Sequence, residues 1–363
     1  MRYQSLDLVR GYAALTVVIA HTTIAGLYNN PNIWPFILWT PLRFLWAGHQ
    51  AVIVFFVLSG FALTKMIDSC LNYNYTRFLA ARIIRLFIPC ILSIFFVFTI
   101  FGCLKKFGFT WEQGWNGVVN PTFNLKELLP HFGLIGSYNY YSVNPPLWSL
   151  VYEARISIFF PLIFLIIKKF RFYGILFFTL LSLLCIYGLY KSPQSTGYDY
   201  FGTTMLTGHY SLFFAMGCIL SFHIEKIKTI LMSISAKMQL LLFIISILVY
   251  CYPFNNPWTL AQRGIGDIVT SFGAIGLLIV STALKESGWF FKLGVFLGKI
   301  SFSLYLTHFT VLSMALITLL PKFGAIAVWA YTIPVSIILA YFFTIIIDKP
   351  SVKLSRIVYK RTC

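Results

Sequence analysis

The sequence predicts an all-α polytopic transmembrane helix bundle of about ten spans, with both termini in the cytoplasm. The first reason is composition. Of the 363 residues, 59% are hydrophobic and only 10% are charged, whereas a soluble domain has about 25% charged residues. The second reason is the length of the apolar runs, most of which reach the roughly 17 residues that a helical span needs. The alternating pattern of about ten residues that is typical of an outer-membrane barrel strand is absent.

Ten apolar runs follow one another with polar breaks between them, and each predicts one helix. The seventh run is the shortest, and the longest connection lies between the third and the fourth. We find no internal repeat and no low-complexity linker, so we expect residues 1–363 to form a single transmembrane domain. The predicted helices cover residues 6–27, 50–67, 84–104, 147–167, 173–190, 206–222, 239–253, 264–283, 299–320 and 325–347.

The lysines and arginines predict the orientation of these helices. If the N-terminus is cytoplasmic, nineteen of the 28 Lys and Arg residues lie in cytoplasmic segments and seven in external ones. This asymmetry follows the positive-inside rule, and we expect a multi-pass protein of the cell inner (plasma) membrane. The net charge of +18 would suggest a nucleic-acid partner for a soluble protein. Here cationic loops against anionic lipid headgroups explain it, so we expect a bilayer and no nucleic acid.

The first apolar run carries three polar residues that are costly in a membrane: Asp7, Arg10 and His21. A charged side chain inside the hydrocarbon costs at least ~2.5 kcal/mol on insertion scales. Arg10 and His21 lie within roughly 20° of one helix face and about 16 Å apart along it. This stripe is a candidate site, although Arg10 has an alternative, a local pair with Asp7 that reaches the headgroups. His21 by itself could also be an ordinary polar contact between helices.

The fourth run supplies a second set of polar residues. Ser149 and Glu153 are four residues apart and share one helix face, and Trp148 adjoins Ser149. In the predicted topology Glu153 and His21 fall at a similar depth, so we expect them to form one polar site. The alternative for Glu153 is a pair with a cation such as Arg155, which would have to come from another helix.

Six stretches of the chain resemble the membrane-bound acyltransferase-3 family, the bacterial O-acyltransferases that modify surface polysaccharides. They are LDLVRGYAALTVVIAH, FFVLSGFAL, RIIRLFIP, PPLWSLVYEARISIFFP, LGKISFSLYLTH and DKP. Their order covers the whole predicted transmembrane unit. One segment departs from the family: in AGHQAVIVFF, Ala51, Val52 and Ile53 stand where relatives often have Gly-Val-Asp. We assign no role to that segment.

The resemblance implies a donor site for acetyl-CoA, a donor substrate that comes from the cytoplasm. The family's essential pair matches Arg10 and His21, and its Arg-x-x-Arg element matches Arg82 and Arg85. Guanidinium groups suit the phosphates of CoA because their donors make bidentate contacts. His21 would be the general base and Glu153 would orient it. Arg82 and Arg85 have an alternative as cations that face lipid headgroups.

The resemblance also implies an acceptor site. The Trp-Ser element matches Trp148 and Ser149, and the ninth run contributes Ser303, Tyr305 and His308. We expect these residues to bind a carbohydrate hydroxyl. Ser303 and Tyr305 have an alternative as packing groups between spans. Asp267, near the outer end of the eighth run, is a further acceptor-site candidate. We expect no metal, because the seven cysteines show no CxxC or other metal-ligand spacing.

The predicted function is that of an O-acyltransferase. It would move an acetyl or other short acyl group from acyl-CoA to a hydroxyl of a cell-envelope carbohydrate, for example the O-antigen of lipopolysaccharide or a lipid-linked precursor. The alternative is a secondary transporter or flippase for a lipid-linked sugar or a small anion, since buried ionisable groups fit that class too. Inverted repeats would favour the transporter, and the sequence has none that we detect.

Overall fold

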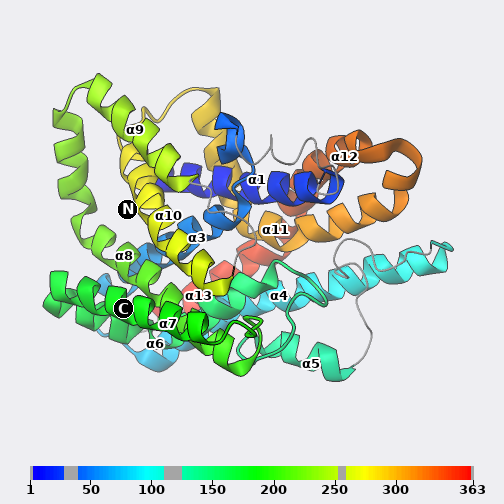
Figure 1. Ribbon diagram of the computed structural model, residues 1–363, viewed down its shortest axis with the longest axis horizontal. Coiled ribbons are helices and arrows are strands. Elements are labelled where there is room, and N and C mark those ends of the chain that lie inside the picture. Colours follow the sequence, from blue (N-terminus) through cyan, green and yellow to red (C-terminus); the bar gives the residue numbers. More distant parts are fainter. Residues whose placement is uncertain (1–2, 28–39, 110–124, 252–258, 361–363) are drawn as a thin grey trace.

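The computed structural model describes residues 3–27, 40–109, 125–251 and 259–360, and within these ranges the chain is helical with no strand (Figure 1). This confirms the predicted all-α bundle. The elements in chain order are α1 (Gln4–Leu27), the 3₁₀ turn η1 (Pro41–Leu45), α3 (Gly48–Asp68), α4 (Tyr75–Lys106), α5 (Leu125–Gly133), α6 (Leu147–Phe170), α7 (Phe172–Lys191), α8 (Tyr200–Ser233), α9 (Ala236–Tyr250), α10 (Leu260–Ser281), α11 (Trp289–Thr318), α12 (Leu320–Phe343), the π-helical turn η3 (Thr344–Asp348) and α13 (Lys349–Lys360).

Each of the ten predicted runs falls on a helix. Among the described residues, eight helices are long and apolar enough to cross a membrane. The two predicted spans outside that set are α9, which has only 15 residues, and α1, whose polar side chains lower its mean hydropathy. α12 continues through η3 into α13, a polar helix that extends the last span beyond its predicted end.

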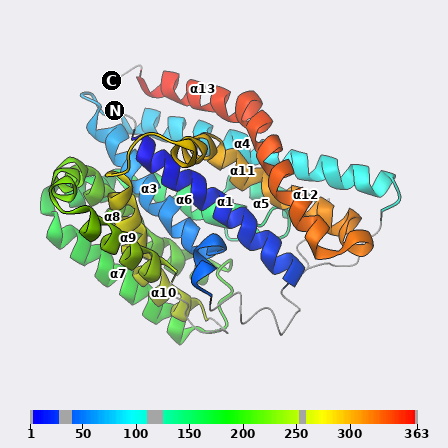
Figure 2. The same ribbon diagram turned by 90° about the horizontal axis from the view of Figure 1, so that it is seen from above.

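The central helices of the bundle are α1, α3 and α11, with α7 and α9 at one edge and α12 at the other (Figures 1 and 2). α1 and α11 cross at van der Waals distance because glycines line the contact. A Cβ built on Gly11 would lie 2.2 Å from the Gly294 carbonyl oxygen, and one built on Gly298 would lie 2.0 Å from that of Asp7. Such small residues let two backbones approach closely.

Contacts at the two ends of α1 show the direction of its neighbours. α3 runs antiparallel to α1, since Tyr3 packs on Phe61 while Gly48 packs on Ala20. Both ends of the described chain reach the same end of α3: Tyr3 packs on Phe61 there, and the Tyr359 hydroxyl donates to the Met66 carbonyl at 2.8 Å. The two termini therefore lie on one side of the bundle, and their cytoplasmic location stays a prediction.

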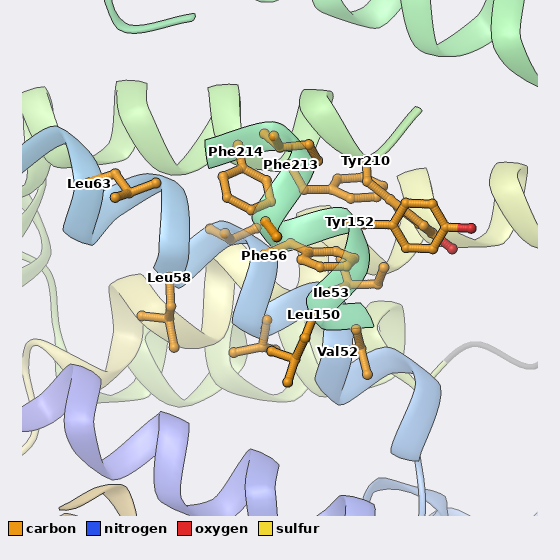
Figure 3. Packing of buried hydrophobic residues seen from close by; sticks show 14 of the residues in the cluster. Val52, Ile53, Phe56, Leu58, Leu63, Leu150, Tyr152, Tyr210, Phe213 and Phe214 are labelled. Carbon is orange, nitrogen blue, oxygen red and sulfur yellow. The ribbon is translucent and has the colours of Figure 1, made fainter. Parts of the chain in front are cut away.

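The buried core joins α3, α6 and α8 through aromatic rings (Figure 3). Tyr210 on α8 lies 4.9 Å from the ring of Phe56 on α3 and 5.0 Å from that of Tyr152 on α6. Large apolar side chains elsewhere, such as Leu184 on α7 and Leu248 on α9, are exposed as expected for lipid-facing surfaces. This core fixes the relative positions of α3, α6 and α8, which also carry buried polar residues.

We predict that Gly298→Ala lowers the melting temperature of the protein in detergent. The new methyl group would collide with the backbone of α1, and overpacking of this kind costs about 1–3 kcal/mol. Gly102→Ala is the matched control, because a Cβ there meets no atom within 4 Å. Equal melting temperatures for the two variants would contradict a close α1–α11 crossing.

Candidate active site

Two histidines from different helices form the centre of the site. His21 Nδ1 on α1 lies 2.8 Å from His308 Nε2 on α11, and the two rings are parallel with centroids 5.1 Å apart. His308 Nδ1 lies 2.9 Å from the Leu304 carbonyl oxygen. Since a carbonyl oxygen only accepts, His308 Nδ1 carries a proton and donates it.

The tautomer of His21 follows from its hydrogen bond to His308. A buried imidazole stays neutral unless a counter-charge holds its proton, so His308 Nε2 carries a lone pair. It therefore accepts from the protonated Nδ1 of His21. The lone pair of His21 is then on Nε2, the atom that a general base needs. A backbone carbonyl thus sets the protonation of both rings.

One helical turn before His308, α11 contacts α6. The Tyr305 hydroxyl lies 2.7 Å from Ser149 Oγ, and both residues are buried. Asn144, just before α6, donates to the Leu306 carbonyl at 2.9 Å. These bonds place the predicted acceptor residues Ser149 and Tyr305 against each other and one turn from the histidine pair.

Trp148, next to Ser149 on α6, contacts a third helix, α3. Its indole stacks on the imidazole of His49 on α3, with centroids 5.8 Å apart and an interplanar angle of 12°. His49 Nε2 lies 2.7 Å from Asp267 Oδ1 on α10. Asp267, proposed from the sequence only as a further candidate, therefore belongs to the same polar region as Trp148. We define the histidine layer as His21, His308, His49 and Asp267.

Glu153 lies elsewhere, which corrects the prediction that it orients His21. Its Oε1 accepts hydrogen bonds from Arg82 Nη2 at 2.8 Å and from Ser59 Oγ at 3.1 Å. Ser59 follows Gly48 by eleven residues on α3, about 16 Å along that helix, and Gly48 packs beside Ala20. Glu153 is therefore well removed from the level of His21.

The alternative partner for Glu153, Arg155, also points elsewhere. Arg155 donates to the carbonyl oxygens of Ile135 and Gly136 at 2.8 and 2.9 Å. Residues two positions apart on a helix face different neighbours. The cation that balances Glu153 comes instead from α4.

Each predicted donor-site arginine is paired with a carboxylate. Arg10 Nη1 lies 3.3 Å from Asp7 Oδ1, which is the local pair that the sequence offered as an alternative. Arg82 binds Glu153 of α6, whereas Arg85 binds Asp348 at the end of η3 and lies over the ring of Phe302 at 4.5 Å. Arg82 and Arg85 are therefore aimed at different helices. We define the arginine layer as these three arginines with Asp7, Glu153 and Asp348.

Ser303 lies between the two layers and is fully buried. Its Oγ accepts a hydrogen bond from Thr344 Oγ1 of η3 at 2.7 Å. The contact joins α11 to the last span, which fits the alternative of a packing residue. Substrate binding by Ser303 stays a prediction.

His49 and His209 were not predicted from the sequence as site residues. His49 lies in the AGHQAVIVFF segment, to which no role was assigned, and just before a predicted span. His209 is fully buried on α8, and its Nε2 lies 3.6 Å from Asp267 Oδ2. A signal did exist: Asp267 is an acidic residue inside an apolar run, and such a residue demands a partner. Among the described residues no group of three or more His, Cys, Asp or Glu is arranged to hold a metal ion.

Comparisons with known proteins indicate an acyltransferase. A family model described as "Acyltransferase domain" (Acyl_transf_3) matches residues 3–347. Three proteins of Staphylococcus aureus, from strains MSSA476, MRSA252 and MW2, carry the name "Putative O-acetyltransferase" and are 27% identical over 368 residues. The alignment covers 94% of this chain and 56% of each relative, so the chain spans about half the length of the curated relatives it matches. No solved structure gives a significant match.

We predict that Glu153→Leu and Arg82→Met each destabilise the protein strongly, whereas the double variant recovers most of the loss. Both side chains are largely buried, with 14% of Arg82 and 15% of Glu153 exposed. Removal of one partner of a buried ion pair costs about 3–5 kcal/mol, while an apolar pair of similar volume is often neutral. Melting temperatures in detergent measure all three. Additive losses would show that the two residues are not coupled.

Proposed function

The chain belongs to the acyltransferase-3 family. We propose that it transfers an acetyl group from acetyl-CoA to a hydroxyl of a cell-envelope carbohydrate. The observation that carries the proposal is the tautomer of His21: the hydrogen bonds of His308 leave the lone pair of His21 on Nε2. We further propose that residues 1–363 act as one domain in the inner membrane, with the arginine layer toward the cytoplasm.

The donor is held by the arginine layer in this proposal. Arg10 and Arg85 have 33% and 27% of their side chains exposed, so a phosphate can reach either of them. Arg82 is less exposed, and its guanidinium already donates to Glu153 and Ser157. Phosphate binding at Arg10 and Arg85 would compete with Asp7 and Asp348, while Arg82 acts as a positioning residue.

The first helix relates this donor site to the base. Eleven residues separate Arg10 from His21, about 16 Å along the helix axis. A flexible pantetheine arm spans a distance of that order. The nucleotide can therefore stay at the arginine layer while the thioester reaches the histidine layer.

At the histidine layer, His21 Nε2 takes the proton of the acceptor hydroxyl as the oxygen attacks the thioester carbon. The C–S bond then breaks with its electron pair on sulfur, so that CoA leaves as a thiolate that takes up a proton. General-base assistance of this kind contributes about 10²–10⁴-fold. His308 keeps Nδ1 of His21 as the donor and accepts its hydrogen bond when the ring becomes charged, in the orienting role that the sequence analysis gave to Glu153.

The acceptor is bound beside the same rings. Ser149 and Tyr305 offer two hydroxyls one turn from His308, and Trp148 offers an aromatic surface next to them. Hydroxyl groups that both donate and accept suit a sugar hydroxyl.

We predict that His21→Ala lowers acetyl transfer by about 10²–10⁴-fold without changing the affinity for CoA. Membranes from cells that express the protein, radiolabelled acetyl-CoA and alkali-labile label in the envelope carbohydrate provide the assay. His223→Ala, a histidine on α8 outside both layers, is the control and should keep wild-type activity. Full activity of a well-expressed His21→Ala protein would refute the mechanism.

We predict that Arg10→Ala raises the KM for acetyl-CoA more than it lowers kcat, because the arginine contacts the donor and not the reacting atoms. The same membrane assay at several acetyl-CoA concentrations separates the two constants. A loss confined to kcat would move Arg10 out of the donor site.

We predict that His308→Asn retains more activity than His308→Ala. An Asn side chain offers an amide oxygen that can accept from His21 Nδ1, whereas Ala leaves that donor without an acceptor. Both variants should exceed His21→Ala in rate. Equal activity of His308→Asn and His308→Ala would mean that the hydrogen bond does not orient the base.

A further inference from the structure

Asp267 is a buried carboxylate whose charge needs a counterpart. The residue is 2% exposed, with His49 Nε2 2.7 Å from Oδ1 and His209 Nε2 3.6 Å from Oδ2. Among the described residues these imidazoles are its ion-pair partners, and Arg263, one turn earlier on α10, makes no ion pair with it. Because an unbalanced buried charge is costly, a proton on one of the two imidazoles stabilises the carboxylate.

His49 is the imidazole that fits this task. His209 is fully buried and its Nδ1 is engaged by Ser182 Oγ at 2.8 Å, whereas 28% of the His49 side chain is exposed. His49 lies in the first turn of α3, where the helix dipole opposes a cation. That effect is weak beside the direct contact with a buried carboxylate, so the contact with Asp267 prevails.

His49 also lies close to the base. Gly48 packs directly on Ala20, and each histidine is the next residue along its helix. A second series of contacts runs around the site, from His21 through His308, Tyr305 and the Trp148–Ser149 pair to His49. Contacts among α1, α11, α6 and α3 therefore connect the two histidines within one polar region.

The two rings differ in the partner that each one has. His21 is hydrogen-bonded to another imidazole, and His49 is hydrogen-bonded to a carboxylate. Two titratable groups with such different partners are the pattern of a base and an acid that act together.

We propose that His49, held by Asp267, is the proton donor of the acyl transfer and works opposite the base His21. This inference rests on the proposed function. The acceptor O–H bond breaks and its proton goes to His21 Nε2 as the new C–O bond forms. The C–S bond breaks with its electron pair on sulfur, and the thiolate takes the proton of His49. The proton left on His21 then returns to His49, so the enzyme is unchanged after a turnover.

A pH profile of the membrane assay tests the assignment. Wild-type activity falls on the acidic side as His21 gains a proton and on the alkaline side as His49 loses one. His49→Gln and Asp267→Asn should lower the rate by about 10²–10⁴-fold and remove the alkaline limb, with CoA affinity unchanged. Among the described residues, the other titratable neighbours of the His49–Asp267 pair are His209, Tyr210 and Arg263, so His209→Gln should keep the alkaline limb. His223→Gln should behave as wild type.

The protonation states of His49 and His21 can be measured by NMR in the absence of substrate. In protein with ¹⁵N-labelled histidine, the His49 ring, assigned by its loss in His49→Gln, should carry protons on both nitrogens at neutral pH. Asp267→Asn should convert it to the neutral form, while His21 stays neutral throughout. A neutral His49 in wild-type protein, or an alkaline limb that survives in His49→Gln, would overturn the proposal while acetyl transfer stands. A doubly protonated His49 in membranes that transfer no acetyl group would instead overturn the proposed function, and the donor role with it.

Discussion

Compensation of buried charge is the constraint on which the rest of this structure depends. Every carboxylate that we have described inside the bundle meets a cationic or imidazole group, and most of these contacts join different helices. Arg82 binds Glu153 across α4 and α6, Arg85 binds Asp348 across α4 and η3, and His49 binds Asp267 across α3 and α10. In a medium that solvates no charge, such pairs are costly to break. They therefore fix which helices are neighbours.

The charged pairs lie in two layers of different chemistry, and this difference suggests a reaction. The arginine layer holds full cations that match phosphates, and the histidine layer holds groups that exchange protons near neutral pH. α1 contributes to both, and its crossing with α11 brings the His21–His308 pair together. A substrate with a charged nucleotide, a long neutral arm and a reactive end matches this arrangement in charge and in length.

Much of this organisation is visible in the sequence, and the part that is not has a physical cause. The apolar runs predict the helices, and their alternation agrees with the antiparallel packing of α1 and α3. Helical spacing places Arg10 and His21 on one face of α1. Spacing along one helix says nothing of its rotation against another, which is why Glu153 was expected beside His21 and instead faces Arg82. His49 was missed because a histidine at a loop boundary carries no periodic signal.

By itself the sequence determined the fold class, the helices, the family and the residues too polar to face lipid, because burial in hydrocarbon acts on each residue individually. Only the tertiary structure decided the partners of those residues, since pairing depends on the crossing and rotation of helices far apart in the chain. It gave His21 an imidazole from α11 as its neighbour and gave His49 a carboxylate from α10. The difference between those two partners separates the proposed base from the proposed acid.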